Sequence, residues 1–248
     1  MKATTLKNAI LMIIVALMAA PIAHAGAPSD YGLLLVGFFH GDAIDAEDGE
    51  TWYGVAEENG NWRATARTIR VGLEFDEIVD QPGEKTGKEV QVLGPPPVFL
   101  ARGGNLQPRA IETVYSERHS LMSTEPALTF QMRSGRDYEL VIRCPEQPEI
   151  SEDENPAGLI PVPEFEPCPI VLIHNEREQE IARLPFNELG YSRAAVMWAG
   201  DLDNDGELDL LMDLSHHYNL SAPTLLLSSE ALEGDLVRPV ADLALYGC

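Results

Sequence analysis

The residues best suited to chemistry lie in one short acidic segment, residues 200–209. Four carboxylates recur through it at short intervals: Asp201, Asp203, Asp205 and Asp209. Calcium is a hard cation that takes six to eight oxygen ligands at about 2.3–2.6 Å. A chain that curls round such an ion points alternate side chains inward, and Gly206 permits the sharp reversal that the curl requires. The segment therefore predicts a calcium-binding loop.

We expect five residues to supply oxygen ligands, the last through its backbone carbonyl: Asp201, Asp203, Asp205, Asp209 and Glu207. The alternative is an acidic turn that is merely solvated. A helix–loop–helix calcium site places a bidentate glutamate at the twelfth position, but Met212 stands there in this chain. The flanking residues 194–198 and 208–214 have the composition of strands. The ion is therefore expected at the tip of a β hairpin.

Gly200-Asp-Leu-Asp-Asn-Asp-Gly-Glu-Leu-Asp-Leu-Leu211 resembles the FG-GAP and VCBS-type repeats of integrin-like propellers and bacterial surface proteins. The resemblance implies that calcium is held at the acidic positions matching Asp201, Asp203, Asp205 and Asp209. A propeller needs several copies at a regular period, whereas this pattern occurs once. The expectation is one hairpin of this kind inside another β architecture.

A second group of polar residues follows the loop and could bind a polar ligand or another metal: Asp213, His216, His217, Tyr218 and Asn219. The alternative is a strand end followed by a polar turn. The sequence contains no Gly-x-Ser-x-Gly, no His-Glu-x-x-His, no phosphate-binding glycine loop and no Cys-x-x-Cys. A catalytic pair of carboxylates that only folding brings together stays an open alternative, because spacing in the sequence does not show which acids meet in the fold. A secreted hydrolase with a site near His216 and His217 is therefore the alternative to a binding protein.

Residues 40–50 form a second acidic segment, which contains Asp42, Asp45 and Glu50. Their spacing does not wrap an ion as residues 201–209 do, so a solvated loop is favoured over a second metal site. The nearby aromatics Trp52, Tyr53 and Trp62 could form a platform for a glycan, but core packing is the commoner fate of such residues.

The first 25 residues have the pattern of a signal peptide. Lys2 and Lys7 precede an apolar run over residues 9–20, and Ala23-His-Ala25 offers a cleavage site. The run is short for a hydrocarbon layer of about 30 Å. We therefore expect a leader at 1–25, no membrane span after its removal, and a periplasmic or extracellular location.

Charge and cysteines agree with export. The chain has 17 basic and 40 acidic residues, a net charge of −23, which repels nucleic acid and anionic membranes and leaves a protein or a glycan as the expected partner. Three cysteines allow three single pairings. The favoured pair is Cys144 with Cys168, since each is followed by proline and adjoins an apolar strand-like run; the partner of Cys248 is open.

The candidate site residues lie among short apolar runs separated by Gly, Pro and Asn, which is the pattern of strands joined by turns. Residues 51–56 and 61–75 predict a hairpin around Asn59-Gly60, and residues 170–174 and 179–184 predict another. We expect a mainly β protein, with antiparallel sandwich or barrel-like domains, and not a full propeller. A weaker pattern over 103–136 leaves open one β-rich region, 26–248, or two subdomains, 26 to about 105 and about 125 to 248. The resulting hypothesis is an exported protein with structural calcium that acts as a binding, interaction or cell-envelope module.

Overall fold

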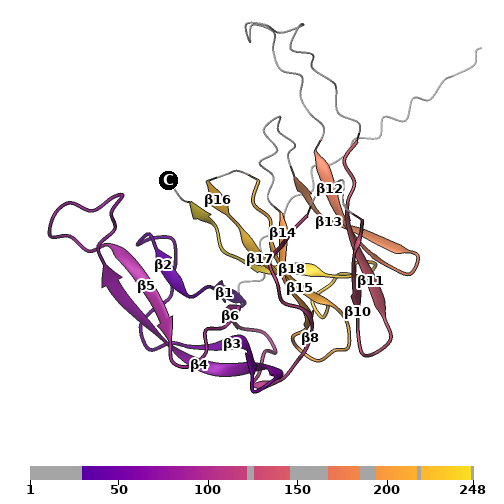
Figure 1. Ribbon diagram of the computed structural model, residues 1–248, viewed down its shortest axis with the longest axis horizontal. Helices are drawn as coiled ribbons and strands as arrows, with labels where there is room; N and C mark the ends of the chain where they lie inside the picture. Colours follow the sequence, from indigo (N-terminus) through magenta and orange to yellow (C-terminus); the bar gives the residue numbers. More distant parts are fainter. Residues whose placement is uncertain (1–29, 122–125, 146–166, 185–193, 217–218, 247–248) are drawn as a thin grey trace, which may run out of the picture.

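The structure is a computed structural model and describes residues 30–121, 126–145, 167–184, 194–216 and 219–246. These residues contain strands and no helix, and their strand pairs are antiparallel (Figure 1). One sheet curls into a half-barrel, and the molecule is not a closed propeller. The predicted fold class is therefore confirmed, while the predicted leader, residues 1–25, lies outside the described residues.

The first sheet has the strand order β1-β6-β3-β4-β5-β2, with β7 beside β4. Its strands are β1 (Gly32–Leu34), β2 (Gly37–Phe39), β3 (Thr51–Glu58), β4 (Asn61–Glu74), β5 (Gly87–Val92), β6 (Phe99–Arg102) and β7 (Arg109–Ala110). The long strand β4 pairs with β3 as far as Thr68 and with β5 from Ile69 onward. This change of partner carries the sheet round a bend.

The middle sheet has the order β18-β17-β15-β14-β8, with β9 also beside β14. Its strands are β8 (Glu112–Tyr115), β9 (His119–Ser120), β14 (Ala195–Asp201), β15 (Asp209–Asp213), β17 (Pro223–Leu227) and β18 (Arg238–Asp242). The third sheet consists, in spatial order, of β10 (Leu128–Gln131), β11 (Asp137–Ile142), β12 (Cys168–His174) and β13 (Arg177–Leu184). A small separate pair joins β16 (Leu220–Ser221) to β19 (Leu245–Tyr246).

Two of the predicted hairpins form around asparagines with a positive φ. Asn59 and Gly60, with φ of 54° and 77°, join β3 to β4 as a two-residue turn whose twist suits the strands. Asn175, with φ of 55°, lies in the turn between β12 and β13. The predicted disulfide also forms and joins Cys144, just after β11, to Cys168 at the start of β12.

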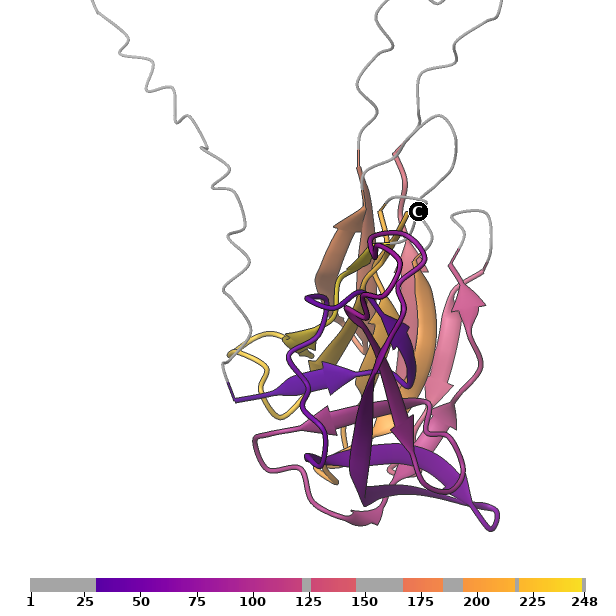
Figure 2. The same ribbon diagram turned by 90° about the vertical axis from the view of Figure 1, so that its left-hand side faces the viewer.

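The middle sheet is buried on both faces and lies between the other two (Figure 1). Figure 2 shows the first sheet in front of it. On one face Leu211 and Leu225 join a hydrophobic cluster shared with the first sheet, here called the first core. On the other face Leu210 and Leu226 join a cluster shared with the third sheet, the second core. Burial on both faces explains why these strands read as unbroken apolar runs rather than as alternating patterns.

The first core mixes residues from both ends of the chain. Leu34 and Val55 of the first sheet pack in one cluster with Trp198 and Val240 of the middle sheet. The division into two subdomains stays a prediction, but the two proposed ranges share this core. The part of the chain that the structure describes includes no helix with the length and apolar character needed to traverse a bilayer.

Candidate metal site

The acidic loop connects β14 to β15 at one end of the middle sheet. Asp201 is the last residue of β14, and Asp209 is the first of β15. The loop reverses through Asn204 and Gly206, which have φ of 62° and 85° and so lie in the left-handed region that glycine and asparagine tolerate. Leu208 is fully buried and ties the loop to the second core. The predicted β hairpin with a loop at its tip is therefore present.

Three carboxylates converge inside this loop. Asp201, Asp203 and Asp209 each offer an oxygen, and these oxygens all lie within 4.8 Å of one another. Asp209 is fully buried and Asp201 is 6 % exposed, while Asp203 is partly buried. No other cluster of acids, histidines or cysteines able to hold a metal ion occurs among the described residues.

Backbone amides hold these carboxylates in place. Asp201 accepts hydrogen bonds from the amides of Asp205 (3.1 Å) and Gly206 (2.9 Å). Asp209 accepts one from the Leu202 amide at 2.8 Å, and the amide and hydroxyl of Ser228 both donate to its other oxygen at 2.8 Å. The carboxylates are thus fixed by neutral donors, which position an anion without neutralising it.

The electrostatics of the group favour a bound cation. In the described chain none of the three carboxylates forms an ion pair. Burial raises the pKa of each, most strongly that of Asp209, and mutual repulsion within the loop adds to the effect. Oδ1 of Asp203 is buried and has no hydrogen-bond partner among the described residues. An all-oxygen cluster with uncompensated charge and an unpartnered oxygen fits a hard metal ion.

The two other predicted ligands lie outside this converging group. Asp205 accepts a hydrogen bond from the Glu207 amide at 2.8 Å, and its other oxygen lies 3.0 Å from the Ser228 hydroxyl, whose single proton is shared with Asp209. The Glu207 side chain turns toward the third sheet, where it accepts from Tyr138 at 2.5 Å and pairs with Arg136 at 3.0 Å. The contributions of Asp205 and of the Glu207 carbonyl to a cation shell stay predictions.

Several residues around the loop were not expected from the sequence. Ser228 and Ser229, which follow β17, hydrogen-bond to Asp209 and Asp203 respectively. Arg109 of the first sheet donates to the Asp203 carbonyl, and Arg136 of the third donates to the Gly206 carbonyl at 2.7 Å. No spacing rule relates these residues to the loop, because folding alone brings them there. The loop therefore contacts all three large sheets.

The second group of candidate residues is only partly assembled. Asp213 is buried, with 1 % of its side chain exposed, and it pairs with Arg118 at 2.6 Å. It also accepts from the amides of Ser215 (3.1 Å) and Ala222 (2.9 Å) and from the hydroxyls of Ser215 and Ser221. Burial alone would raise its pKa, but the bonds from Ser215 and Arg118 outweigh burial and hold the pKa below its usual range. Asp213 therefore anchors the end of β15 and has little capacity left for a ligand.

The remaining members of that group do not form a described cluster. His216 is exposed, and Asn219 is partly exposed with a partner of its own. His217 and Tyr218 lie outside the described residues, as does Cys248. The hypothesis of a hydrolase site near His216 and His217 therefore gains no support from Asp213.

The second acidic segment is engaged in local structure. Asp48 accepts from the Val71 amide at 3.0 Å. Glu50 accepts from the indole of Trp52 at 3.0 Å and from Arg102 at 2.8 Å, and the guanidinium of Arg102 lies 4.3 Å from the centre of the Trp52 ring. Trp52 is 3 % exposed and belongs to the first core, as the core-packing alternative expects, so it is not available as a glycan platform.

Comparison with known proteins gives no match: no protein-family model, no curated protein and no solved structure matches the chain. The resemblance of residues 200–211 to calcium-binding repeats therefore stays a proposal. The geometry and charge of Asp201, Asp203 and Asp209 are the evidence that a metal ion can be held here.

Proposed function

We propose that this chain is an exported β protein stabilised by calcium at the loop between β14 and β15, and that it acts as an interaction module in or outside the cell envelope. The observation that carries the proposal is the convergence of three carboxylates, two of them buried, none of which forms an ion pair with a described residue. Crowded buried carboxylates are costly unless a cation joins them.

Calcium is the ion that suits these donors best. The group offers carboxylate oxygens and no nitrogen or sulfur, which favours a hard cation over zinc or copper. Magnesium demands a near-ideal octahedron and usually retains several waters, whereas calcium accepts irregular shells built largely from protein oxygens. Asp205, which the resemblance to FG-GAP repeats includes, and the Glu207 carbonyl, which the loop sequence suggests, would complete such a shell.

The position of the loop supports a structural role for the ion. Arg109 connects it to the first sheet, Arg136 and Tyr138 connect it to the third, and Ser228 connects it to the strand beside β15. An ion that fixes the loop would therefore strengthen the junction of the three sheets. Extracellular calcium modules commonly have Kd values of about 10⁻⁴–10⁻³ M. A concentration ten times Kd stabilises the folded state by about 1.4 kcal/mol.

The proposed location and role have separate support. The Cys144–Cys168 disulfide is consistent with an oxidising compartment, and residues 1–25 have the composition of an export signal. The net charge of −23 disfavours nucleic acid as a partner. A protein or glycan partner is the class that remains.

Thermal unfolding with millimolar calcium and with excess chelator tests the proposal. We expect calcium to raise the melting temperature of the natural chain and to leave that of Asp203→Ala unchanged, because the variant loses the least restrained of the three carboxylates. Asp45→Ala is the matched control, since it removes the same charge from an exposed position in the second acidic segment. It should respond to calcium as the natural chain does.

Two outcomes would contradict the proposal. An equal calcium response in Asp203→Ala and the natural chain would place the ion elsewhere. An absence of any response to millimolar calcium, magnesium or manganese would mean that the three carboxylates do not bind a cation of this kind.

A further inference from the structure

One apolar stripe of the first sheet continues beyond the core that it helps to form. On β4 and just after it, the residues of one face are Ile69, Val71, Leu73 and Phe75. Their exposure rises from 0 % at Ile69 through partial burial at Val71 to 60 % at Leu73 and 44 % at Phe75. The apolar pattern typical of a buried face thus continues onto residues that are largely exposed.

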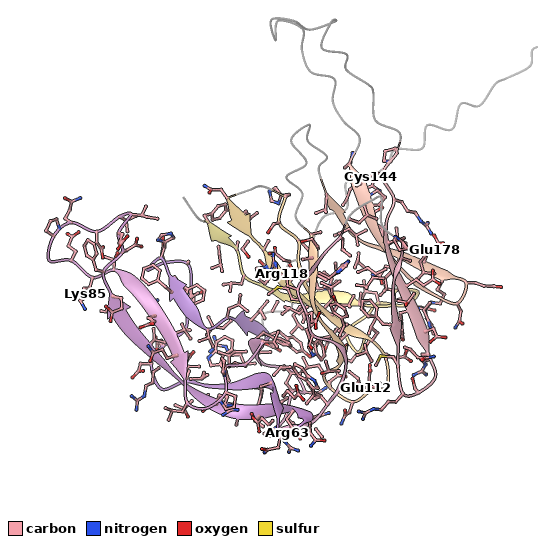
Figure 3. The ribbon with its side chains drawn as sticks, viewed as in Figure 1. Arg63, Lys85, Glu112, Arg118, Cys144 and Glu178 are labelled. Carbon is pink, nitrogen blue, oxygen red and sulfur yellow. A yellow bond between two sulfur atoms is a disulfide. The ribbon has the colours of Figure 1, made fainter. Side chains whose placement is uncertain are left out.

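The uncovered part lies on an arm formed by β2, β5, the end of β4 and the turn over residues 75–86. Figure 1 shows the arm projecting at the left, away from the middle and third sheets, and Figure 3 marks it with Lys85. In the turn, Ile78 and Val79 are 54 % and 57 % exposed. Exposed apolar groups gathered in this way are typical of interaction surfaces.

The same arm has a short open strand edge at Leu73, near the end of β4. Pairing of β4 with β3 ends at Thr68. Beyond it, the backbone groups of β4 that point away from β5 bond to Glu50 and Asp48 instead. The Ile69 amide bonds to the Glu50 carbonyl at 2.9 Å, and the Val71 amide bonds to Asp48 at 3.0 Å. Every second residue of a strand points its backbone N–H and C=O to the same edge. The N–H and C=O of Leu73 therefore point to the same edge as those of Ile69 and Val71, and no described strand pairs with them there. An unpaired edge with apolar side chains is a template for an added strand.

The turn that presents Ile78 and Val79 is held in one conformation. His40 lies 2.5 Å from the buried carboxylate of Asp76, which also accepts from the Ile78 amide at 3.0 Å. Asp80 accepts from the amides of Asp76 and Thr86, both at 2.8 Å. A surface fixed in this way loses little conformational entropy when a partner binds.

Charge on the arm indicates the chemistry of that partner. Residues 74–89 contain six acids and two lysines. One lysine, Lys85, already pairs with Glu74 at 3.3 Å, and the other, Lys88, donates to the Ile44 carbonyl at 2.8 Å. The uncompensated charge on the arm is therefore negative. A second copy of this acidic chain would meet like charge, whereas a basic segment would meet complementary charge.

We propose that the arm binds an extended, basic segment of another protein, which adds as a strand to the open edge of β4 and places its apolar side chains on Leu73 and Phe75. The proposal names a surface and a partner class for the interaction role proposed above. Its residues are separate from those of the loop over residues 201–209, here called the cation loop, so either proposal can fail without the other.

The probe for the test is a short labelled peptide that alternates lysine with valine, and the comparison peptide alternates glutamate with valine. Fluorescence anisotropy with the full mature chain should show binding of the basic peptide at least tenfold tighter than of the acidic one. Leu73→Asp should weaken that binding at least tenfold. Leu73→Pro should do the same, because proline removes the outward amide while edge positions tolerate it. Leu232→Asp is the matched control, because Leu232 is also 60 % exposed.

Binding of the basic peptide that is unchanged in Leu73→Asp and Leu73→Pro would overturn the proposal. A dimer in sedimentation that Leu73→Asp abolishes would also overturn it, since the partner would then be a second copy. A cooperative thermal melt of each variant, measured with calcium and with chelator, shows that the variants are folded. It also separates failure at the arm from failure at the cation loop.

Discussion

At the scale of single residues, Asp203 is the most informative position in the cation loop. One of its oxygens accepts from Ser229, and the other is buried and has no hydrogen-bond partner in the part of the chain that the structure describes. The substitution Asp203→Asn keeps the shape of the side chain and removes the charge. An amide placed there can also donate to the neighbouring carboxylates of Asp201 and Asp209.

Asp203→Asn should therefore stabilise the protein in chelator and weaken its stabilisation by calcium. In chelator we expect a variant more stable than the natural chain, because repulsion among the three carboxylates is relieved. With calcium we expect it to need at least tenfold more of the ion for the same stabilisation, since affinity depends on ligand charge. Urea unfolding in chelator and across a calcium titration measures both effects. A variant less stable than the natural chain in chelator would show that the carboxylates are not in conflict.

The ion pair between Arg118 and Asp213 gives a prediction about pH. Because the folded-state pKa of Asp213 is depressed, its charge adds stability above its unfolded value of about 3.9, and this stability is lost as the pH falls through the folded-state pKa. Arg118→Met should lower the free energy of unfolding by about 1–3 kcal/mol at neutral pH. The loss should shrink as the solution is acidified toward the depressed pKa. Urea unfolding from neutral to acidic pH measures it.

A second arginine provides the control for that measurement. Arg143 is as exposed as Arg118, at 49 % and 50 %, but its partner Glu178 is also 49 % exposed. Pairs of exposed charges contribute about 0–1 kcal/mol. Arg143→Met should therefore cost less than Arg118→Met. Equal losses would mean that burial of Asp213 does not decide the strength of its pair.

At the scale of elements, the disulfide closes the connection between β11 and β12. Cys144 and Cys168 are 24 residues apart in the sequence. Closing a loop of that length stabilises the folded chain by about 3–4 kcal/mol through the lost entropy of the unfolded chain. The double substitution Cys144→Ser with Cys168→Ser should lower the free energy of unfolding by about that amount in urea. Cys248→Ser leaves this bond intact and should change little; an equal loss there would contradict the assignment.

The elements that the sequence predicts best are those whose signals are local. Asn59-Gly60 specifies a tight hairpin, and alternation from Ile69 onward identifies a strand with two unlike faces. The converging carboxylates are predictable for the same reason, because Asp201, Asp203 and Asp209 lie within nine residues of chain. The loop's anchors on other sheets, Arg109 and Arg136, are not predictable. Their contacts join residues 94 and 70 positions apart and exist only once the sheets have packed.

At the scale of the whole molecule, the middle sheet makes the two cores depend on each other. Leu210 and Leu211 are adjacent and fully buried, yet one faces the second core and the other the first. Leu210→Ala and Leu211→Ala should each lower the free energy of unfolding by about 2–5 kcal/mol. Each substitution should shift the single transition in which both cores unfold together.

Tryptophan fluorescence and far-UV circular dichroism can check this coupling. Trp52, Trp62 and Trp198 all report on the first core, whereas dichroism reports on every strand. We expect the two signals to give the same unfolding midpoint in the natural chain and in each variant. If Leu210→Ala shifts the midpoint measured by dichroism but leaves the midpoint measured by fluorescence unchanged, the result would support two independent subdomains.

Contact between β1 and β18 has a consequence for how the chain comes to be folded. A ribosome completes Gly32 long before Asp242, so the first sheet is made early and its partners on the far side of the first core are made last. Until the middle sheet has been made, Leu34 and Val55 lack the part of the first core that it supplies, which includes Trp198 and Val240. Contacts of such long sequence separation also form slowly. We therefore expect the first core to close late in synthesis, after the strands of the middle sheet from β14 to β18 have been made.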